Sequence, residues 1–385
     1  MTKNSPAIVL FFVLSILPGL DTVFDIAPSK LGGAESTAAN VPLSFETFWT
    51  EEWQRSIDKW WSRALGFRGI FIRSDNQLCL SLFNELGSQN RQRVIVGKDD
   101  YLFEKGYITA YKNSVNDPQV GAIQSIVAGI RRSEDFLKSH GIPMIVLISP
   151  SKASVLPDKL PAGTQPEGEP LRDYRAFVEE LERQGVTFFD GRKWLVENKA
   201  NLLGPIFYRS GAHWSQESGC RVAAQVFSIL QSKLQKPLRT IACEPVKERV
   251  QARGQDADLL RLANIWTTAR FTEPYLYPAG PIDRSAGTFV PKVIFVGSSF
   301  LWDPIDMIRK ARLADRKRSR LYYYFKTRAI NPNNKLGPID PASTKWREEV
   351  LGSDAVIVEI NESAVLQVGF GFFEALNSAV PPGSG

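Results

Sequence analysis

The segment Val293–Phe300, with the sequence VIFVGSSF, determines the fold that we expect for this chain. A short apolar run of this kind is typical of a buried strand, and the glycine after it allows a tight turn at the edge of a sheet. Two adjacent serines, Ser298 and Ser299, follow that glycine. A serine exposed on a strand-to-loop turn can be deprotonated by a nearby imidazole, as acyl transfer requires. The segment therefore predicts a strand that ends in a candidate nucleophile.

Strands and helices alternate on the N-terminal side of this segment, and a further strand follows it. Apolar runs predict strands, and apolar residues at helical spacing predict amphipathic helices. The expected strands are 94–96, 144–148, 186–189, 292–296 and 355–360, and the expected helices are 120–140, 171–184 and 216–234. This alternation predicts an α/β fold with a mostly parallel sheet covered by helices on both faces. Functional loops of such sheets gather at the carboxyl ends of the strands.

One of the only two histidines in the 385 residues is the candidate partner of the serines. His213 lies in the segment Tyr208–Ser215, YRSGAHWS, directly before an expected helix. A serine after a strand can instead cap the next helix, and an isolated histidine can be purely structural. His140 needs no such role, because a cation at a helix C-terminus is explained by the helix dipole. His213 and Ser299 are therefore the candidate base and nucleophile.

The N-terminus carries Lys3 and then the apolar run Pro6–Leu20. Its length of about fifteen residues is short for a helix across a bilayer, which needs roughly 20, and fits the apolar core of a secretory signal. We predict that residues 1–27 are a signal peptide or membrane anchor, followed by a linker over 28–44. The small residues at 31–40 offer no unambiguous cleavage site, so cleavage stays open, and a buried N-terminal helix is the alternative.

The segment Phe45–Leu65 has aromatic and aliphatic residues spaced three and four apart, which predicts a helix with one apolar face. Tryptophan-rich helices can lie at membrane surfaces. Because acidic residues such as Glu46, Glu51 and Asp58 interrupt this segment, we expect it to dock against the protein's own body.

Composition and charge exclude several classes of protein. A content of 43% apolar and 23% charged residues is that of a globular chain. The net charge is +6, and its densest cluster, at residues 309–320, is either a solvated helix face or a surface for an acidic partner. No nucleic-acid-binding motif accompanies the cluster, so a nucleic-acid partner is not expected.

Three cysteines, Cys79, Cys220 and Cys243, allow at most one intramolecular disulfide. Export would permit a bridge between Cys220 and Cys243, which the sequence alone does not establish. The spacing of the cysteines does not suit a metal site, so no metal is expected.

Four segments resemble, by their order, the alginate O-acetyltransferase family of the AlgJ and AlgX type, whose domain is SGNH-hydrolase-like and permuted. They are Gly97–Phe103, Ser149–Lys152, His213–Trp214 and Gly297–Phe300. The resemblance covers roughly residues 45 to 370. It implies an SGNH-hydrolase-like domain, which we place at 45–375 with a flexible tail at 376–385.

The resemblance also implies the activity. Proteins of this family add acetyl groups to an exported bacterial polysaccharide during its biosynthesis, in the periplasm, alongside a membrane-bound O-acyltransferase that supplies acetyl. By this resemblance Ser299 is the nucleophile, His213 is the base and no cofactor is needed. The protein is expected in the periplasm, with the N-terminal segment either cleaved or serving as an inner-membrane anchor.

Two further residues are weaker candidates for substrate binding. Lys152 follows the strand that begins at Met144, and it either holds an anionic sugar in the cleft or is a solvated loop lysine. Asn361 follows the last expected strand and is a candidate donor to the oxyanion of the acyl-transfer intermediate.

One position departs from the family pattern, because Gly211 stands where the family has an aspartate two residues before the histidine. That carboxylate holds the imidazole in the productive tautomer. An acid from elsewhere is one solution, a Ser–His dyad is another, and a catalytically impaired polysaccharide-binding or assembly subunit is a third. If water outcompetes the sugar, the same site is an acetylesterase. The candidate acids, without ranking, are Asp190, Glu217, Asp256, Asp258 and Glu362.

Overall fold

The chain folds into two compact units. One unit comprises residues 1–96 and 259–270, and the other comprises 97–258 and 271–385. The computed structural model describes residues 11, 16–22, 24, 31–33, 41–64, 66–88, 90–244, 246–278, 289–331 and 333–378. The SGNH-hydrolase-like domain that we expect at 45–375 includes residues of both units.

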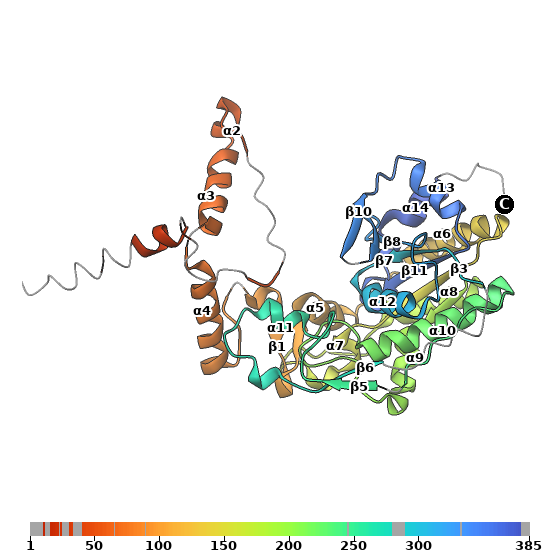
Figure 1. Cartoon of the computed structure of the whole chain (residues 1–385), viewed down its shortest axis with the longest axis horizontal. Helices are drawn as coiled ribbons and strands as arrows, with labels where there is room; N and C mark the ends of the chain where they lie inside the picture. The colour runs from red at the N-terminus through yellow and green to blue at the C-terminus, as the bar shows by residue number, and fades with distance from the viewer. Residues whose placement is uncertain are drawn as a thin grey trace, which may run out of the picture. The chain divides into compact units, whose positions relative to one another are not determined.

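The larger unit is built on a seven-stranded sheet (Figure 1). Five neighbouring strands run parallel, and β9 and β10 extend one side of the sheet as antiparallel strands. In spatial order the strands are β10 (Asn334–Pro338), β9 (Thr327–Asn331), β8 (Arg320–Tyr323), β7 (Val293–Gly297), β11 (Ala355–Asn361), β3 (Met144–Ser149) and β4 (Phe188–Asp190). The expected strand at 186–189 thus begins two residues later, at Phe188.

Each face of the sheet carries its own hydrophobic core, because alternate residues of a strand point to opposite faces. Met144, Val146 and Ile148 of β3 face one core, and Ile145 and Leu147 face the other. The first core is completed by α6 (Val120–Ser139), α8 (Arg172–Arg183), α13 (Lys345–Leu351) and α14 (Phe372–Asn377). The second is completed by α9 (Gly191–Glu197), α10 (Gln216–Leu234) and α12 (Trp302–Ala311). The predicted α/β fold, a mostly parallel sheet covered on both faces, is confirmed.

The remaining elements of this unit are short. They include the helices α5 (Lys105–Asn113) and α7 (Lys152–Val155), the strand β2 (Leu102–Glu104) and the antiparallel pair β5 (Val246–Arg249) and β6 (Tyr275–Pro278). Helix α14 ends at Asn377 and buries Leu376, so the folded part extends past the expected boundary at 375. Residues 379–385 of the expected tail lie outside the described residues.

The N-terminal unit contains α2 (Phe45–Trp49), α3 (Glu52–Ala64), α4 (Arg68–Phe83) and β1 (Val94–Val96). Helix α11 (Asp258–Ala263) begins with the last residue of the larger unit's first segment. The single helix expected at 45–65 is broken at Glu51, whose φ is 59°. Phe45 and Trp49 are 82% and 68% exposed, and the docking of this aromatic segment stays a prediction.

Most of the N-terminal segment for which we predict a signal peptide or anchor at 1–27 lies outside the described residues, as does most of the expected linker at 28–44. Among the residues that the structure describes, no helix is long and apolar enough to span a bilayer.

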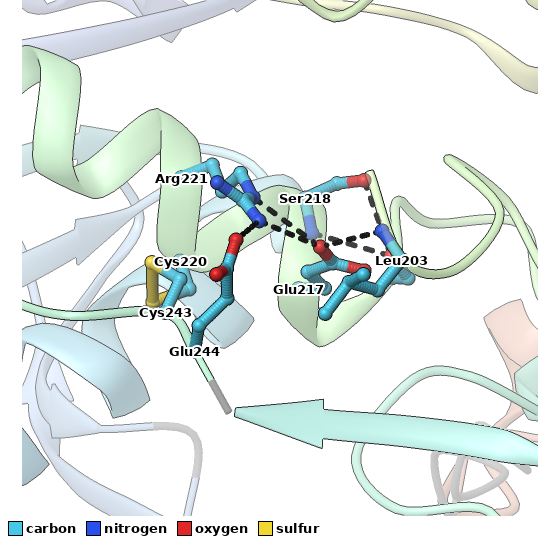
Figure 2. The surroundings of a disulfide bond; sticks show 8 residues. Leu203, Glu217, Ser218, Cys220, Arg221, Cys243 and Glu244 are labelled. Carbon is cyan, nitrogen blue, oxygen red and sulfur yellow. Dashed lines mark hydrogen bonds and ion pairs between the residues drawn. A yellow bond between two sulfur atoms is a disulfide. The ribbon is translucent and has the colours of Figure 1, made fainter. Parts of the chain in front are cut away.

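A disulfide joins Cys220 on α10 to Cys243 (Figure 2). Figure 2 also shows the neighbouring Arg221 paired with both Glu217 and Glu244. These contacts tie α10 to the segment that leads into β5. Cys79 is the free cysteine.

Candidate active site

The turn after β7 exposes Ser299 at the carboxyl end of the parallel strands. Gly297 is required there, because a Cβ at this position would lie 2.7 Å from a carboxylate oxygen of Glu359 and 2.8 Å from Leu301. The backbone N–H of Ser298 donates to the same buried Glu359, at 2.7 Å. This bond holds the turn against β11. Ser299 then begins a short 3-10 helix that leads into α12.

The loop before α10 holds His213. An isolated bridge between Phe207 and Trp214 closes this loop, and Ser215 caps α10. The indole Nε1 of Trp214 donates to the carbonyl of Phe300 at 3.0 Å. Because Phe300 follows Ser299, this bond ties the histidine loop directly to the serine turn.

The serine, the histidine and an aspartate form a continuous hydrogen-bonded series. Ser299 Oγ lies 2.8 Å from His213 Nε2, and His213 Nδ1 lies 2.8 Å from Asp258 Oδ2. The other carboxylate oxygen of Asp258 accepts the backbone N–H of Ala212, also at 2.8 Å. A carboxylate at Nδ1 holds the proton on that nitrogen, so Nε2 is available to accept the serine proton.

The electrostatics of His213 suit a general base. Burial alone would lower the pKa of His213, but the hydrogen bond and the charge of Asp258 outweigh burial and raise that pKa above its ordinary value. The side chain of His213 is only 9% exposed, so bulk water screens these interactions weakly.

The absence of an aspartate at position 211 has a steric explanation. A Cβ on Gly211 would lie 2.7 Å from the carbonyl oxygen of Asp256 and 2.9 Å from that of Gln255. The backbone that delivers Asp258 to His213 therefore occupies the space that a side chain at 211 would need. Asp258 was one of the five unranked candidate acids, and the structure selects it.

The other four candidate acids have different partners or surroundings. Asp190 caps α9, Glu217 accepts two backbone N–H groups, and Glu362 pairs with an arginine. Asp256 is fully buried, and burial, followed by the charge of Asp303, raises its pKa to about 8. None of these four carboxylates hydrogen-bonds His213 among the described residues.

The expectation that Lys152 binds an anionic sugar or is solvated in a loop is wrong. Lys152 is 2% exposed, and burial lowers its pKa to about 7. Its three N–H donors are shared among four backbone carbonyl oxygens, those of Leu102, Tyr208, Arg209 and Gly211, which lie 2.6 to 2.8 Å from Nζ. Three of these belong to the loop that carries His213, so Lys152 braces that loop from inside.

Asn361 also differs from its expected role as an oxyanion donor. Its amide nitrogen donates to Ser149 Oγ and to the carbonyl of Pro150, both at 3.1 Å, and its amide oxygen accepts from Ser363. Because both amide N–H groups are engaged, Asn361 fastens the ends of β3 and β11 to each other and has no donor left for a substrate.

Sequence reasoning missed two residues that surround the catalytic series. The hydroxyl of Tyr323, at the end of β8, interacts with the side chain of Ser299. Asp303, in the first turn of α12, is buried, and burial raises its pKa to about 7. The run of three tyrosines at 322–324 was the available signal for the first of them.

An α/β fold with serine, histidine and aspartate in series at the carboxyl edge of its sheet defines a serine-dependent acyl-transfer enzyme. The family model described as SGNH hydrolase-like domain, acetyltransferase AlgX, matches residues 94–304, which is more than half of the chain. The chain belongs to this family of SGNH-hydrolase-like O-acetyltransferases, and the predicted resemblance is confirmed.

Solved structures with similarity to the chain have low sequence identity to it. The O-acetyltransferase domain of Pseudomonas putida AlgJ is 18% identical, with 71% of this chain and 92% of that domain covered and a TM-score of 0.45. Pseudomonas aeruginosa AlgX is 14% identical, with 73% and 66% covered and a TM-score of 0.41. Bacillus cereus PatB1 with a sulfonyl adduct is 10% identical, with 71% and 97% covered and a TM-score of 0.44. No curated protein matches the chain.

Proposed function

We propose that this O-acetyltransferase acetylates a hydroxyl group of an exported polysaccharide, with Ser299 as nucleophile, His213 as general base and Asp258 as the acid that orients the imidazole. The single observation that supports these roles is the series of two 2.8 Å hydrogen bonds from Asp258 through His213 to Ser299.

In the first step, Nε2 of His213 takes the proton of Ser299 Oγ, and Oγ attacks the carbonyl carbon of an acetyl ester. The bond from that carbon to the donor's alkoxy oxygen breaks, and the departing alcohol takes the proton back from His213. The product of this step is an acetyl ester of Ser299. The backbone N–H of Ser299 is the proposed donor to the oxyanion that forms on the way.

In the second step, a sugar hydroxyl gives its proton to His213 and attacks the acetyl carbonyl of the ester. The bond to Ser299 Oγ breaks, Oγ recovers the proton, and the acetylated sugar leaves. If water takes the place of the sugar, the product is acetate. Exclusion of water therefore separates the transferase from an acetylesterase.

The periplasm is the proposed compartment, and a membrane-bound O-acyltransferase is the proposed supplier of acetyl. The disulfide between Cys220 and Cys243 supports an oxidising compartment, since such bonds persist outside the reducing cytosol. Anchoring through residues 1–27 stays a prediction, as does the division into signal or anchor, linker and SGNH-hydrolase-like domain.

The test measures acetate release from a chromogenic acetyl ester and acetyl transfer to oligosaccharides, with wild type, Ser299→Ala and His213→Ala. Ser232→Ala and His140→Ala are the matched controls, because both of these residues are exposed and away from the series. We expect both activities to fall by a factor on the order of 10³ or more in the two site variants and to be unchanged in the controls.

A binding or assembly role would give a different pattern. In that case wild type and Ser299→Ala would both fail to release acetate and to transfer acetyl to oligosaccharides, while both would still bind polymer. Undiminished activity in His213→Ala would overturn the assignment of the base.

A further inference from the structure

A cavity of mixed polar and apolar lining opens beside the candidate active site, within the larger unit. Its volume is about 320 Å³, within the range of roughly 300–1,000 Å³ that is typical of small-ligand sites. We call it the α5 cavity, and its lining includes Tyr111, Asn113, Asn116, Asp173, Glu362 and Gln367. The proposed chemical steps use none of these residues.

The sheet register places the α5 cavity at the same edge as the nucleophile. Strand β11 lies between β7 and β3, with Val358 level with Val296 and Asn361 level with Ser149. Ser299 lies two residues beyond the end of β7, and Ser151, which lines the cavity, lies two residues beyond the end of β3. Neighbouring strands are about 4.8 Å apart, so the two strand ends are roughly 10 Å apart.

Helix α5 gives an independent estimate of the distance between the nucleophile and the cavity lining. The ring of Tyr107 contacts that of Phe300, the residue after the nucleophile, with 6.2 Å between ring centroids. Tyr111 and Asn113 lie four and six residues further along the helix, at about 6 and 9 Å for a rise of 1.5 Å per residue. A polysaccharide held at Ser299 is long enough to reach this cavity.

The lining offers hydrogen-bonding groups that the protein leaves unused. Asn113, Asn116 and Gln367 are exposed, and their amides make no hydrogen bond with any residue in the described ranges, so a ligand can reach them. The same lack of a partner holds for the hydroxyl of Tyr111, whose side chain is otherwise buried. A side-chain amide presents two donors and an acceptor oxygen, which can pair with the single donor and the acceptor oxygen of a sugar hydroxyl. Such a lining is complementary to a hydroxyl-rich ligand.

The charges of the lining restrict that ligand further. The lining contains three carboxylates, those of Asp117, Asp173 and Glu362, and no lysine, arginine or histidine. Arginines pair with two of them, Arg172 with Asp117 at 2.7 Å and Arg192 with Glu362 at 2.5 Å, so these cations are already engaged. The same pairing offsets the charges of Asp117 and Glu362, so a carboxylate on the ligand would meet the charge of Asp173 with no free cation in the lining, which is unfavourable at close range.

We propose that the α5 cavity is a glycan-binding subsite of this acetyltransferase and that it selects an uncharged, hydroxyl-rich sugar unit over a uronate. The inference rests on the proposed polysaccharide substrate, and it narrows that substrate to a neutral polymer or to neutral units within a mixed one.

The first test is calorimetric titration of the full chain with two probes, a linear neutral glucan hexasaccharide and a mannuronate hexasaccharide. We expect the neutral probe to bind at least tenfold more tightly at low ionic strength. Removing one amide, in Asn113→Ala or Gln367→Ala, is expected to weaken that binding roughly threefold to tenfold, the value of one hydrogen bond. Equal or tighter binding of the uronate probe, or unchanged binding in both variants, would overturn the proposal.

A substitution that adds a positive charge to the lining should favour the uronate probe instead. Asn116→Lys puts a cation into the lining and should raise the affinity for the uronate probe severalfold. Asn201→Lys makes the same change at an exposed position away from the cavity and should leave that affinity as it is. Equal gains in both variants would mean that net charge alone is responsible and would overturn the cavity assignment.

Turnover of a small chromogenic acetyl ester separates this inference from the proposed function. Asn113→Ala should raise the KM for oligosaccharide acceptor about threefold to tenfold and leave turnover of the small ester unchanged. If the wild type does not turn over the small ester, the proposed chemistry is wrong. The two binding titrations would still decide the role of the cavity.

Discussion

The carboxylate of Asp258 lies 2.8 Å from Nδ1 of His213 and reaches it from 45 residues further along the chain. In this chain the carboxylate that hydrogen-bonds the imidazole thus comes from a different segment than the one that carries the histidine. Glycine at position 211 is what makes room for that segment.

Replacing Asp258 by asparagine should preserve the shape of the site and remove its tautomer control. We expect turnover of a chromogenic acetyl ester to fall by a factor on the order of 10⁴, the loss seen when a serine protease triad loses its acid function. Asp306→Asn, a change at a half-buried residue of α12 that pairs with Lys310 and does not contact His213, is the control. A loss smaller than tenfold in Asp258→Asn would mean that Ser299 and His213 act as a dyad.

Restoring the family's aspartate in Gly211→Asp should fail. Its Cβ would press on two backbone carbonyls, which cannot move away as a flexible side chain would, so we expect destabilisation of about 1–3 kcal/mol. Urea unfolding of this variant measures the loss. Rescue of Asp258→Asn by Gly211→Asp at wild-type stability would contradict this steric account.

The acid limb of the activity profile should lie above the ordinary histidine pKa of about 6.5. His213 must be neutral to accept a proton, and the hydrogen bond and charge of Asp258 raise its pKa against the effect of burial. As pH falls through that raised pKa, kcat/KM should therefore fall. The pH profile of kcat/KM in wild type and Asp258→Asn tests this, and the residual activity of the variant should have its limb at lower pH. If the acid limb of the kcat/KM profile lies at the same pH in Asp258→Asn, it reports the titration of a group other than His213.

Asp256 should make the protein less stable as pH rises. Its carboxyl is fully buried, and its pKa is raised to about 8, so between the unfolded value near 4 and that pKa the folded state binds more protons than the unfolded state. Stability therefore declines with pH across this window, by at most about 1.4 kcal/mol per pH unit. In Asp256→Asn, urea unfolding at pH 5 and pH 8 should show a smaller decline. An identical slope in both proteins would contradict the assignment.

Lys152 should matter for folding more than for substrate affinity. Lys152→Met keeps most of the side-chain volume but leaves four carbonyls without their donor, which should cost about 3 kcal/mol. Lys138→Met changes an exposed lysine on α6 and is the control for thermal or urea unfolding. A variant with wild-type stability and only a raised KM for acceptor would return Lys152 to a substrate-binding role.

Reduction of the disulfide should weaken the larger unit. The bond closes a segment with a sequence separation of 23 residues, for which chain entropy predicts about 3 kcal/mol. The double variant Cys220→Ser and Cys243→Ser should therefore unfold at a lower temperature than the wild type, and reductant should no longer affect it. Cys79→Ser, which removes the free cysteine, should behave as the wild type does in both conditions.

The sequence predicts the centre of the fold well, because the buried strands β3 and β11 contain the continuous apolar runs Met144–Ile148 and Ala355–Val358. It does not predict β9 and β10, which carry arginine, asparagine and lysine at the antiparallel side of the sheet. It also misses the break at Glu51, because a helix with the apolar spacing of 45–65 gives no sign of a positive φ within it.

For the site, the sequence nominates Ser299 and His213 by residue type and by their place at strand and helix ends. It could not rank Asp258 above the other acids, because proximity across 45 residues depends on how the loop after β5 folds back. Lys152 was misjudged for a related reason, since lysine is rarely buried and only the converging carbonyls make its burial favourable.

One consequence of the glycine at 211 concerns how relatives should be recognised. A search pattern that demands an aspartate two places ahead of the histidine would discard this chain, although its imidazole has a carboxylate neighbour. The acid of a Ser–His–acid series is best defined by where its carboxylate lies, next to Nδ1 of the histidine. Either the segment before the histidine or a later segment can place a carboxylate there, provided that the other segment leaves the space free.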